Sequence, residues 1–119
     1  MKPRILLLMD VMQQEIIFSA QHKKSPYSAI RYLGIFTPDA IKPILGNFKK
    51  KFDAIAVPSY YRYGGVLETI MENYNGPLIL VHSNHDNYDP PPNRDIIHIE
   101  LPFKVSEFDA LIEKYFKKL

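Results

Sequence analysis

The chain has 119 residues, a formal net charge of +2 and no cysteine, and 46% of its residues are hydrophobic. This length fits a single domain over residues 1–119 that buries a core. The lack of thiols excludes disulfides and thiolate metal sites. No apolar run is long enough to span a membrane, and the small charge makes nucleic acid a poor partner. We expect a cytoplasmic protein.

Short apolar strands alternate with helical patterns along the chain. The apolar and β-branched runs predict strands at residues 5–9, 29–36, 53–57, 78–81 and 96–99. Helical spacing predicts helices at residues 11–24, 38–51, 66–74 and 106–119. This order predicts an α/β fold: a doubly wound, five-stranded parallel sheet in flavodoxin-like strand order.

Several helix details follow from local chemistry. The first helix is expected to turn Met12, Ile16, Ile17 and Ala20 inward, and the second Ile41, Ile44, Leu45 and Phe48. Thr37 is expected to cap the second helix, and Ser106 with Asp109 to form a capping box on the last. Residues 83–94 contain three consecutive prolines, which predict a loop where the fold would otherwise place a fourth helix.

Parallel sheets place their functional sites at the carboxyl ends of the strands. The residues expected there are Met9 and Asp10, Pro58, His82, and Leu101. Only one of the five, Asp10, is a carboxylate.

The ordered set of local patterns resembles the receiver domain of two-component response regulators. The matching pieces are residues 4–10, 52–58, 63–70, 76–82 and 101–111. The resemblance implies a flavodoxin-like fold and, in a working receiver, two adjacent carboxylates and a phosphoacceptor aspartate that hold Mg²⁺. It also implies a hydroxyl residue and a lysine that contact the phosphoryl oxygens.

This chain departs from that pattern at most positions. Met9 and Asp10 fill the acidic pair, Pro58 the phosphoacceptor, His82 the hydroxyl position and Leu101 the lysine. Ser59 is next to the phosphoacceptor position, but a serine forms no labile acyl phosphate. Most of the electrostatics that phosphoryl transfer needs is missing. The resemblance therefore implies the scaffold of a receiver without its switch, a pseudo-receiver.

A second interpretation starts from Asn84, His85 and Asp86, which resemble a turn of the metallophosphoesterases. Asp10, His85 and Asp86 would then be metal ligands of a small hydrolase, although the same three residues also suit an ordinary turn. His82, His85 and His98 either converge with Asp10 on a transition metal or are separate surface histidines.

The loop after the third strand contains Tyr60, Tyr61, Arg62 and Tyr63. Tyrosine and arginine are enriched at binding hot spots, and a loop packed on the sheet rim is the alternative. The favoured interpretation is a phosphorylation-independent interaction module, not an enzyme, with no cofactor and with another protein or a second copy as partner. Its contacts would be the four loop residues, Tyr88 and Phe103, together with the last helix, the fifth strand and residues 83–94.

Overall fold

The computed structural model describes residues 2–48, 52–83, 86 and 88–117. The elements are β1 Arg4–Leu7, α1 Val11–Ser19, β2 Ser28–Arg31, α2 Pro38–Phe48, β3 Ala54–Pro58, the 3₁₀ helix η1 Ser59–Gly64, α3 Val66–Asn73, β4 Leu78–His82, β5 Ile96–Glu100 and α4 Val105–Lys117. No helix in the described part of the chain is long and apolar enough to cross a membrane.

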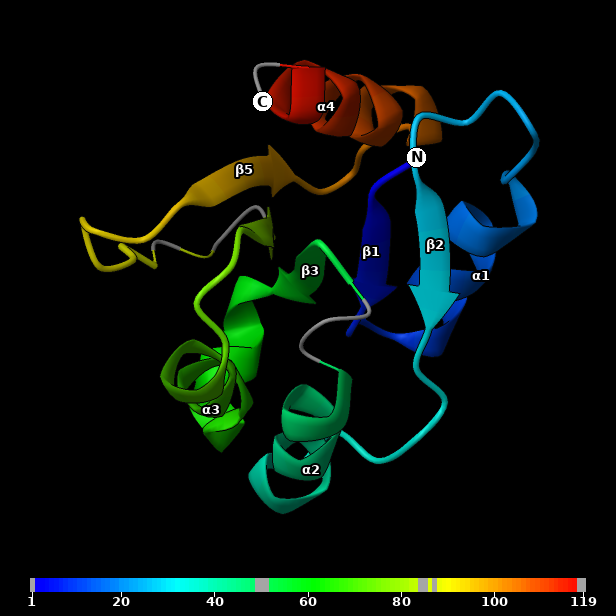
Figure 1. The fold of residues 1–119 in the computed structure, drawn as a ribbon. Coiled ribbons are helices and arrows are strands. Elements are labelled where there is room, and N and C mark those ends of the chain that lie inside the picture. The colour runs from blue at the N-terminus through cyan, green and yellow to red at the C-terminus, as the bar shows by residue number, and fades with distance from the viewer. Residues whose placement is uncertain (1, 49–51, 84–85, 87, 118–119) are drawn as a thin grey trace.

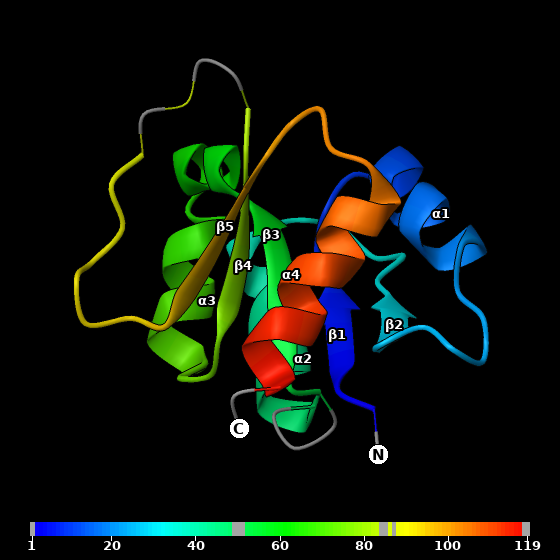
Figure 2. The ribbon, with the colours of Figure 1, turned by 90° about the horizontal axis from the view of Figure 1, so that it is seen from above.

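The five strands form one parallel sheet in the order β2-β1-β3-β4-β5. This is the flavodoxin-like order expected from the sequence, and it leaves β2 and β5 as the edge strands. Figure 1 shows α2 and α3 on one side of the sheet and α4 on the other. Ile17 of α1 packs into the same core as Phe108 and Ile112 of α4, so these two helices cover the same face of the sheet. Figure 2 shows both helices in the view from above.

Alternate residues of the central strands supply two cores, one on each face of the sheet. In β1, Leu6 joins the core under α2 and α3, whereas Ile5 and Leu7 join the core under α1 and α4. Phe108 and Ile112 anchor α4 in this second core. Strands covered on both faces explain the continuous apolar runs in the sequence.

The structure corrects the expected first helix. It ends at Ser19, not near residue 24, because Tyr27 is buried against Phe108 and the chain must turn back to reach that place. Its inward residues are Gln14 and Ile17, whereas Met12 and Ile16 are exposed. The expected inward face was therefore wrong except at Ile17.

Two further boundaries differ from expectation. β2 ends at Arg31, and residues 32–36 form a loop in which the Tyr32 hydroxyl donates to the Ile35 carbonyl at 2.8 Å. The capping box of α4, expected at Ser106 and Asp109, lies two residues earlier, at Lys104 and Glu107. The helix begins at Val105, and the Glu107 carboxylate accepts from the Lys104 amide at 3.0 Å.

Other expectations are confirmed. The Thr37 hydroxyl accepts from the Ala40 amide at 3.2 Å, as a cap of α2 should. The described residues between β4 and β5 form no helix, so the proline-rich segment stands in place of one. The expected inward position of Phe48 lies outside the described side chains.

Candidate functional site

The carboxyl edge of the sheet brings Asp10 together with the segment that follows β3. Asp10 comes directly before α1, and both its oxygens accept hydrogen bonds, from the Tyr60 hydroxyl at 2.6 Å and from the Tyr61 hydroxyl at 3.1 Å. Burial and the neighbouring Asp10 carboxylate raise the pKa of both tyrosines, so they stay neutral donors. Both oxygens of the Asp10 carboxylate are thus bound by the protein's own hydroxyl groups.

Pro58 ends β3, and Ser59 follows it as the first residue of η1. Ser59 is fully buried, and its hydroxyl donates to the Asp86 carboxylate. Neither residue offers a nucleophile to solvent. The expectation that position 58 lies at the strand end is confirmed. The Ser59 hydroxyl is engaged in its hydrogen bond with Asp86.

Arg62 joins η1 to the segment after β4. Its guanidinium forms an ion pair with Asp86 and also donates to the Ser59 carbonyl at 3.2 Å. It lies 4.4 Å from the ring centre of Tyr63 and 5.1 Å from that of Tyr88, within reach of cation–π attraction. Arg62 therefore links η1 to the segment after β4, although the two are far apart in the sequence.

The Asp86 side chain is only 3% exposed. Burial acts to raise the pKa of this carboxyl, but the bonds from Ser59 and Arg62 outweigh it and lower the pKa overall. The Tyr88 amide also donates to Asp86, at 3.2 Å. Asp86 is therefore ionised, and both of its carboxylate oxygens accept hydrogen bonds from other residues of the chain.

His82, the last residue of β4, contacts His98 in the middle of β5. Their rings stack with centres 5.0 Å apart, and His82 Nε2 lies 2.7 Å from His98 Nδ1. Burial of His82, together with its proximity to His98, lowers the pKa of His82. In this contact one ring nitrogen donates a hydrogen bond and the other accepts it.

Leu101 lies where the resemblance expects a lysine. Its amide donates to the His82 carbonyl at 2.7 Å, its side chain packs into the core under α1 and α4, and the bond to Pro102 is cis. Phe103 stacks on Phe108 with ring centres 5.6 Å apart. Part of the Phe103 ring is therefore covered by this contact, which reduces the area that Phe103 can offer to a partner.

The expected metal ligands do not converge in the described part of the chain. Asp10 is bound by two tyrosines and Asp86 by Ser59 and Arg62, while His85, like Asn84, lies outside the described residues. Nor do any three histidine, aspartate or glutamate side chains among the described residues group as metal ligands. Of the three histidines proposed to cluster, the structure brings together His82 and His98.

Gln14 is a residue of this edge that the sequence did not single out. Its amide donates to the Met9 carbonyl at 2.7 Å and to the Tyr32 carbonyl at 2.8 Å, and its side-chain oxygen accepts from the Tyr32 amide at 2.9 Å. The side chain is fully buried. Its spacing from Ile17, three residues on, is the one sequence signal that places it on the inward face.

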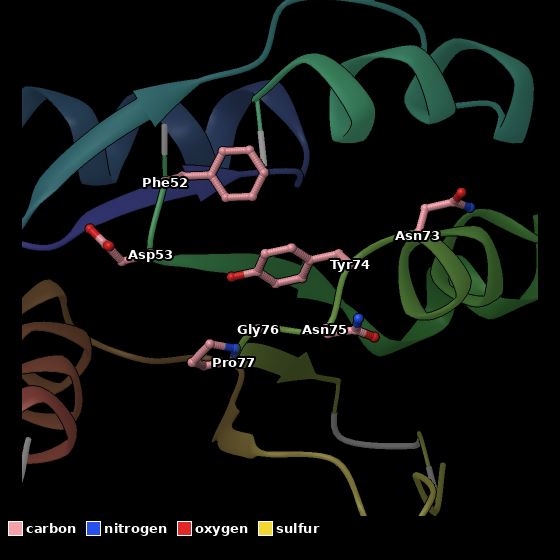
Figure 3. Close-up of a pocket in the computed structure, with 7 residues that line it drawn as sticks. All are labelled: Phe52, Asp53, Asn73, Tyr74, Asn75, Gly76 and Pro77. Carbon is pink, nitrogen blue, oxygen red and sulfur yellow. The ribbon is translucent and has the colours of Figure 1, made fainter. Parts of the chain in front are cut away.

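A hollow of about 410 Å³ lies at the opposite, amino edge of the sheet, where the loops lead into β3 and β4 (Figure 3). Phe52 and Tyr74 face each other across it, with ring centres 5.3 Å apart. Asp53, on its rim, accepts from the Arg4 amide at 2.7 Å. This carboxylate supports the start of the sheet, and the hollow is remote from the strand ends described above.

The comparisons with known proteins support the fold. Neither the known family models nor the curated proteins include a match to this chain. Among solved structures, the chain is similar to a response regulator receiver domain protein from Bacillus halodurans, with a TM-score of 0.69, 12% identity and 97% of each chain covered. At this identity the likeness shows the fold alone: a receiver-like, flavodoxin-like five-stranded sheet, as the sequence predicted.

Proposed function

We propose that this chain is a pseudo-receiver: a signalling module that works by binding another protein without being phosphorylated. The observation that carries the proposal is the state of Asp10. Both its oxygens are bound by Tyr60 and Tyr61, beside a strand end where Pro58 stands in place of a phosphoacceptor. The carboxylate that would hold a cation is thus hydrogen-bonded to two side chains of the protein itself.

The charge balance of this edge supports the same conclusion. Mg²⁺ binds through several oxygen ligands, and in carboxylate sites usually through more than one acidic residue. Here Met9 contributes a buried thioether beside the single carboxylate of Asp10. His82 and Leu101 supply neither a hydroxyl nor a cationic amine for phosphoryl oxygens. A phosphorylated state would lack most of its electrostatic stabilisation.

The contacts of η1 with Asp86 and Tyr88 support a permanent conformation. Asp86 is bound by both Ser59 and Arg62, and Arg62 lies between the rings of Tyr63 and Tyr88. A switch requires two states of similar free energy. A buried ion pair and two ring contacts at one point favour a single state. We therefore expect the binding surface to be present at all times, without an activation step.

A partner would meet an aromatic and basic surface on this side of the molecule. Tyr63 is 79% exposed, and its ring covers one face of the Arg62 guanidinium. Tyrosine side chains lose little entropy when they bind, and tyrosine and arginine are both frequent anchors of interfaces. We place the contact on η1 and Tyr88, continuing over β5 and the start of α4 at Phe103.

The first test is exposure to a small phosphodonor, such as acetyl phosphate with Mg²⁺, followed by intact mass spectrometry. A working receiver domain treated in parallel is the positive control. The proposal predicts no gain of a phosphoryl group, since Pro58 has no nucleophile and Ser59 is buried. A phosphoryl group that is present on the wild type and absent from Asp10→Asn would contradict it.

A metal-dependent hydrolase is not proposed as a second function. Its two described carboxylates, Asp10 and Asp86, belong to separate hydrogen-bonded groups. No observation on the described residues favours it over the binding module.

A further inference from the structure

Helix α1 and the loop after β2 present apolar side chains to solvent. The exposed fractions of six residues range from 44% to 79%. These residues, called the α1 patch below, are Val11, Met12, Ile16, Phe18, Leu33 and Ile35. In the described part of the chain, every exposed large hydrophobic residue except Tyr63 belongs to this patch.

The outward face of α1 is apolar although the helix already buries another face in the core. Ile17 and Gln14 point inward, and Met12 and Ile16, one turn apart, point outward. Helix α4 behaves differently, because it buries Phe108 and Ile112 and turns lysines and glutamates to solvent. Exposed apolar side chains that gather on one surface mark an interaction site more often than a bare surface, which indicates that something covers this side of α1.

The two segments of the α1 patch are fastened to each other. Gln14 of α1 bonds both the amide and the carbonyl of Tyr32, directly before Leu33. Arg31 forms an ion pair with Glu15 at 2.9 Å, and its guanidinium lies 5.4 Å from the ring centre of Phe18. These contacts hold α1 and the start of the loop after β2 together, so a partner would not have to order this junction.

The area of the α1 patch matches half of a stable interface. A fully exposed large apolar residue presents roughly 200 Å², so the exposed fractions correspond to roughly 700 Å² in total. This exceeds the largest apolar patch of most monomers, about 300–600 Å². A standard interface buries about 800 Å² on each partner, so two copies of the patch suffice.

We propose that the α1 patch binds a second copy of this chain across a two-fold axis. A two-fold interface brings the same surface of both copies together, so it must be complementary to itself. The patch meets this condition, because Glu15 and Arg31 lie side by side within the apolar surface. In the dimer each residue can face its opposite on the other copy, and the small net charge of +2 opposes association weakly.

This proposal goes beyond the proposed function, since it names a partner and a surface separate from η1, β5 and α4. The sequence interpretation left another protein and self-association equally open. Neither proposal needs the other: a chain that takes up a phosphoryl group can still dimerise through α1, and a monomer can still be a pseudo-receiver.

Sedimentation equilibrium on the full chain, from about 5 to 300 µM, tests the dimer. The wild type is expected to dimerise, and Met12→Glu and Leu33→Glu are each expected to raise the dissociation constant at least tenfold by placing a charge in the apolar contact. Ala110→Glu, on the exposed face of α4, adds the same charge elsewhere and is expected to leave it unchanged. Equal melting temperatures would show that the variants remain folded.

A charge swap tests the two-fold arrangement. Glu15→Arg and Arg31→Glu are each expected to weaken the dimer, and the double variant to restore it. A wild type that stays monomeric at 300 µM overturns the proposal, as does equal weakening by Ala110→Glu. A double variant as weak as the two single variants contradicts the two-fold pairing of these charges.

Discussion

Replacing Arg62 with alanine tests the fastening of η1 to the segment after β4. The change removes the cation beside Asp86, whose side chain is only 3% exposed. Removing one partner of a buried ion pair costs roughly 3–5 kcal/mol, because an unpaired charge stays buried. Ser59 and the Tyr88 amide still donate to Asp86, and Arg62 itself is 25% exposed, so we expect a loss of about 3 kcal/mol.

A matched control is available in Arg31. Its side chain is also 25% exposed, but its partner Glu15 is 59% exposed. Exposed ion pairs contribute about 0–1 kcal/mol, so Arg31→Ala should lose less than about 1 kcal/mol. Urea unfolding followed by circular dichroism at about 2 µM chain gives both free energies of unfolding by linear extrapolation. Equal losses in the two variants would refute the claim that burial of Asp86 sets the cost.

Three further predictions concern the carboxyl edge and the helix cap. Gln14→Met should lower the free energy of unfolding by about 2–3 kcal/mol, because it leaves three backbone groups without partners. Gln13→Met, at a side-chain oxygen with no partner among the described residues, should cost less than 1 kcal/mol in the same urea titration. The lowered pKa of His82 means that the folded state binds fewer protons than the unfolded state. This contribution to stability should therefore be complete above about pH 6.5, fall as the pH drops from there to the lowered pKa, and level off below it. Melting curves of His82→Gln should show a shallower fall with pH, and an unchanged slope would mean that a group other than His82 sets it. Thr37→Ala should cost about 1 kcal/mol by removing the α2 cap, and a neutral result in the urea titration would show that Pro38 alone starts the helix.

The fold could be predicted because its signals are local. Continuous apolar runs mark strands covered on both faces, and the Thr37 cap and the triple proline mark where α2 begins and where a helix is missing. Parallel strands separated by helices then leave few topologies to choose from. The strand-end positions of Pro58 and His82 followed directly from these runs, whereas β1 ends at Leu7, two residues before the expected Met9.

The contacts of the site could not be predicted, because each depends on residues far apart in the chain. Asp10 meets Tyr60 and Tyr61, and Arg62 meets Asp86, only once the sheet has brought the ends of its strands together. Spacing in a sequence carries no information about such pairs.

The face of α1 was mispredicted for a related reason. Its apolar residues lie on both sides of the helix, so periodicity gave no unique inward face. The polar Gln14 occupies the buried side because its amide matches three backbone groups. If a second copy covers the outward face, the apolar residues there are explained as well.

The most direct test of the pseudo-receiver is the melting temperature with and without Mg²⁺ and beryllofluoride, which mimics a phosphoryl group on a receiver aspartate. A ligand that binds only the folded state must raise the melting temperature. Because Pro58 fills the phosphoacceptor position and Asp10 is bound by two tyrosines, we expect no shift. A rise that requires both Mg²⁺ and beryllofluoride, and that Asp10→Asn abolishes, would show a working acidic site and contradict the account.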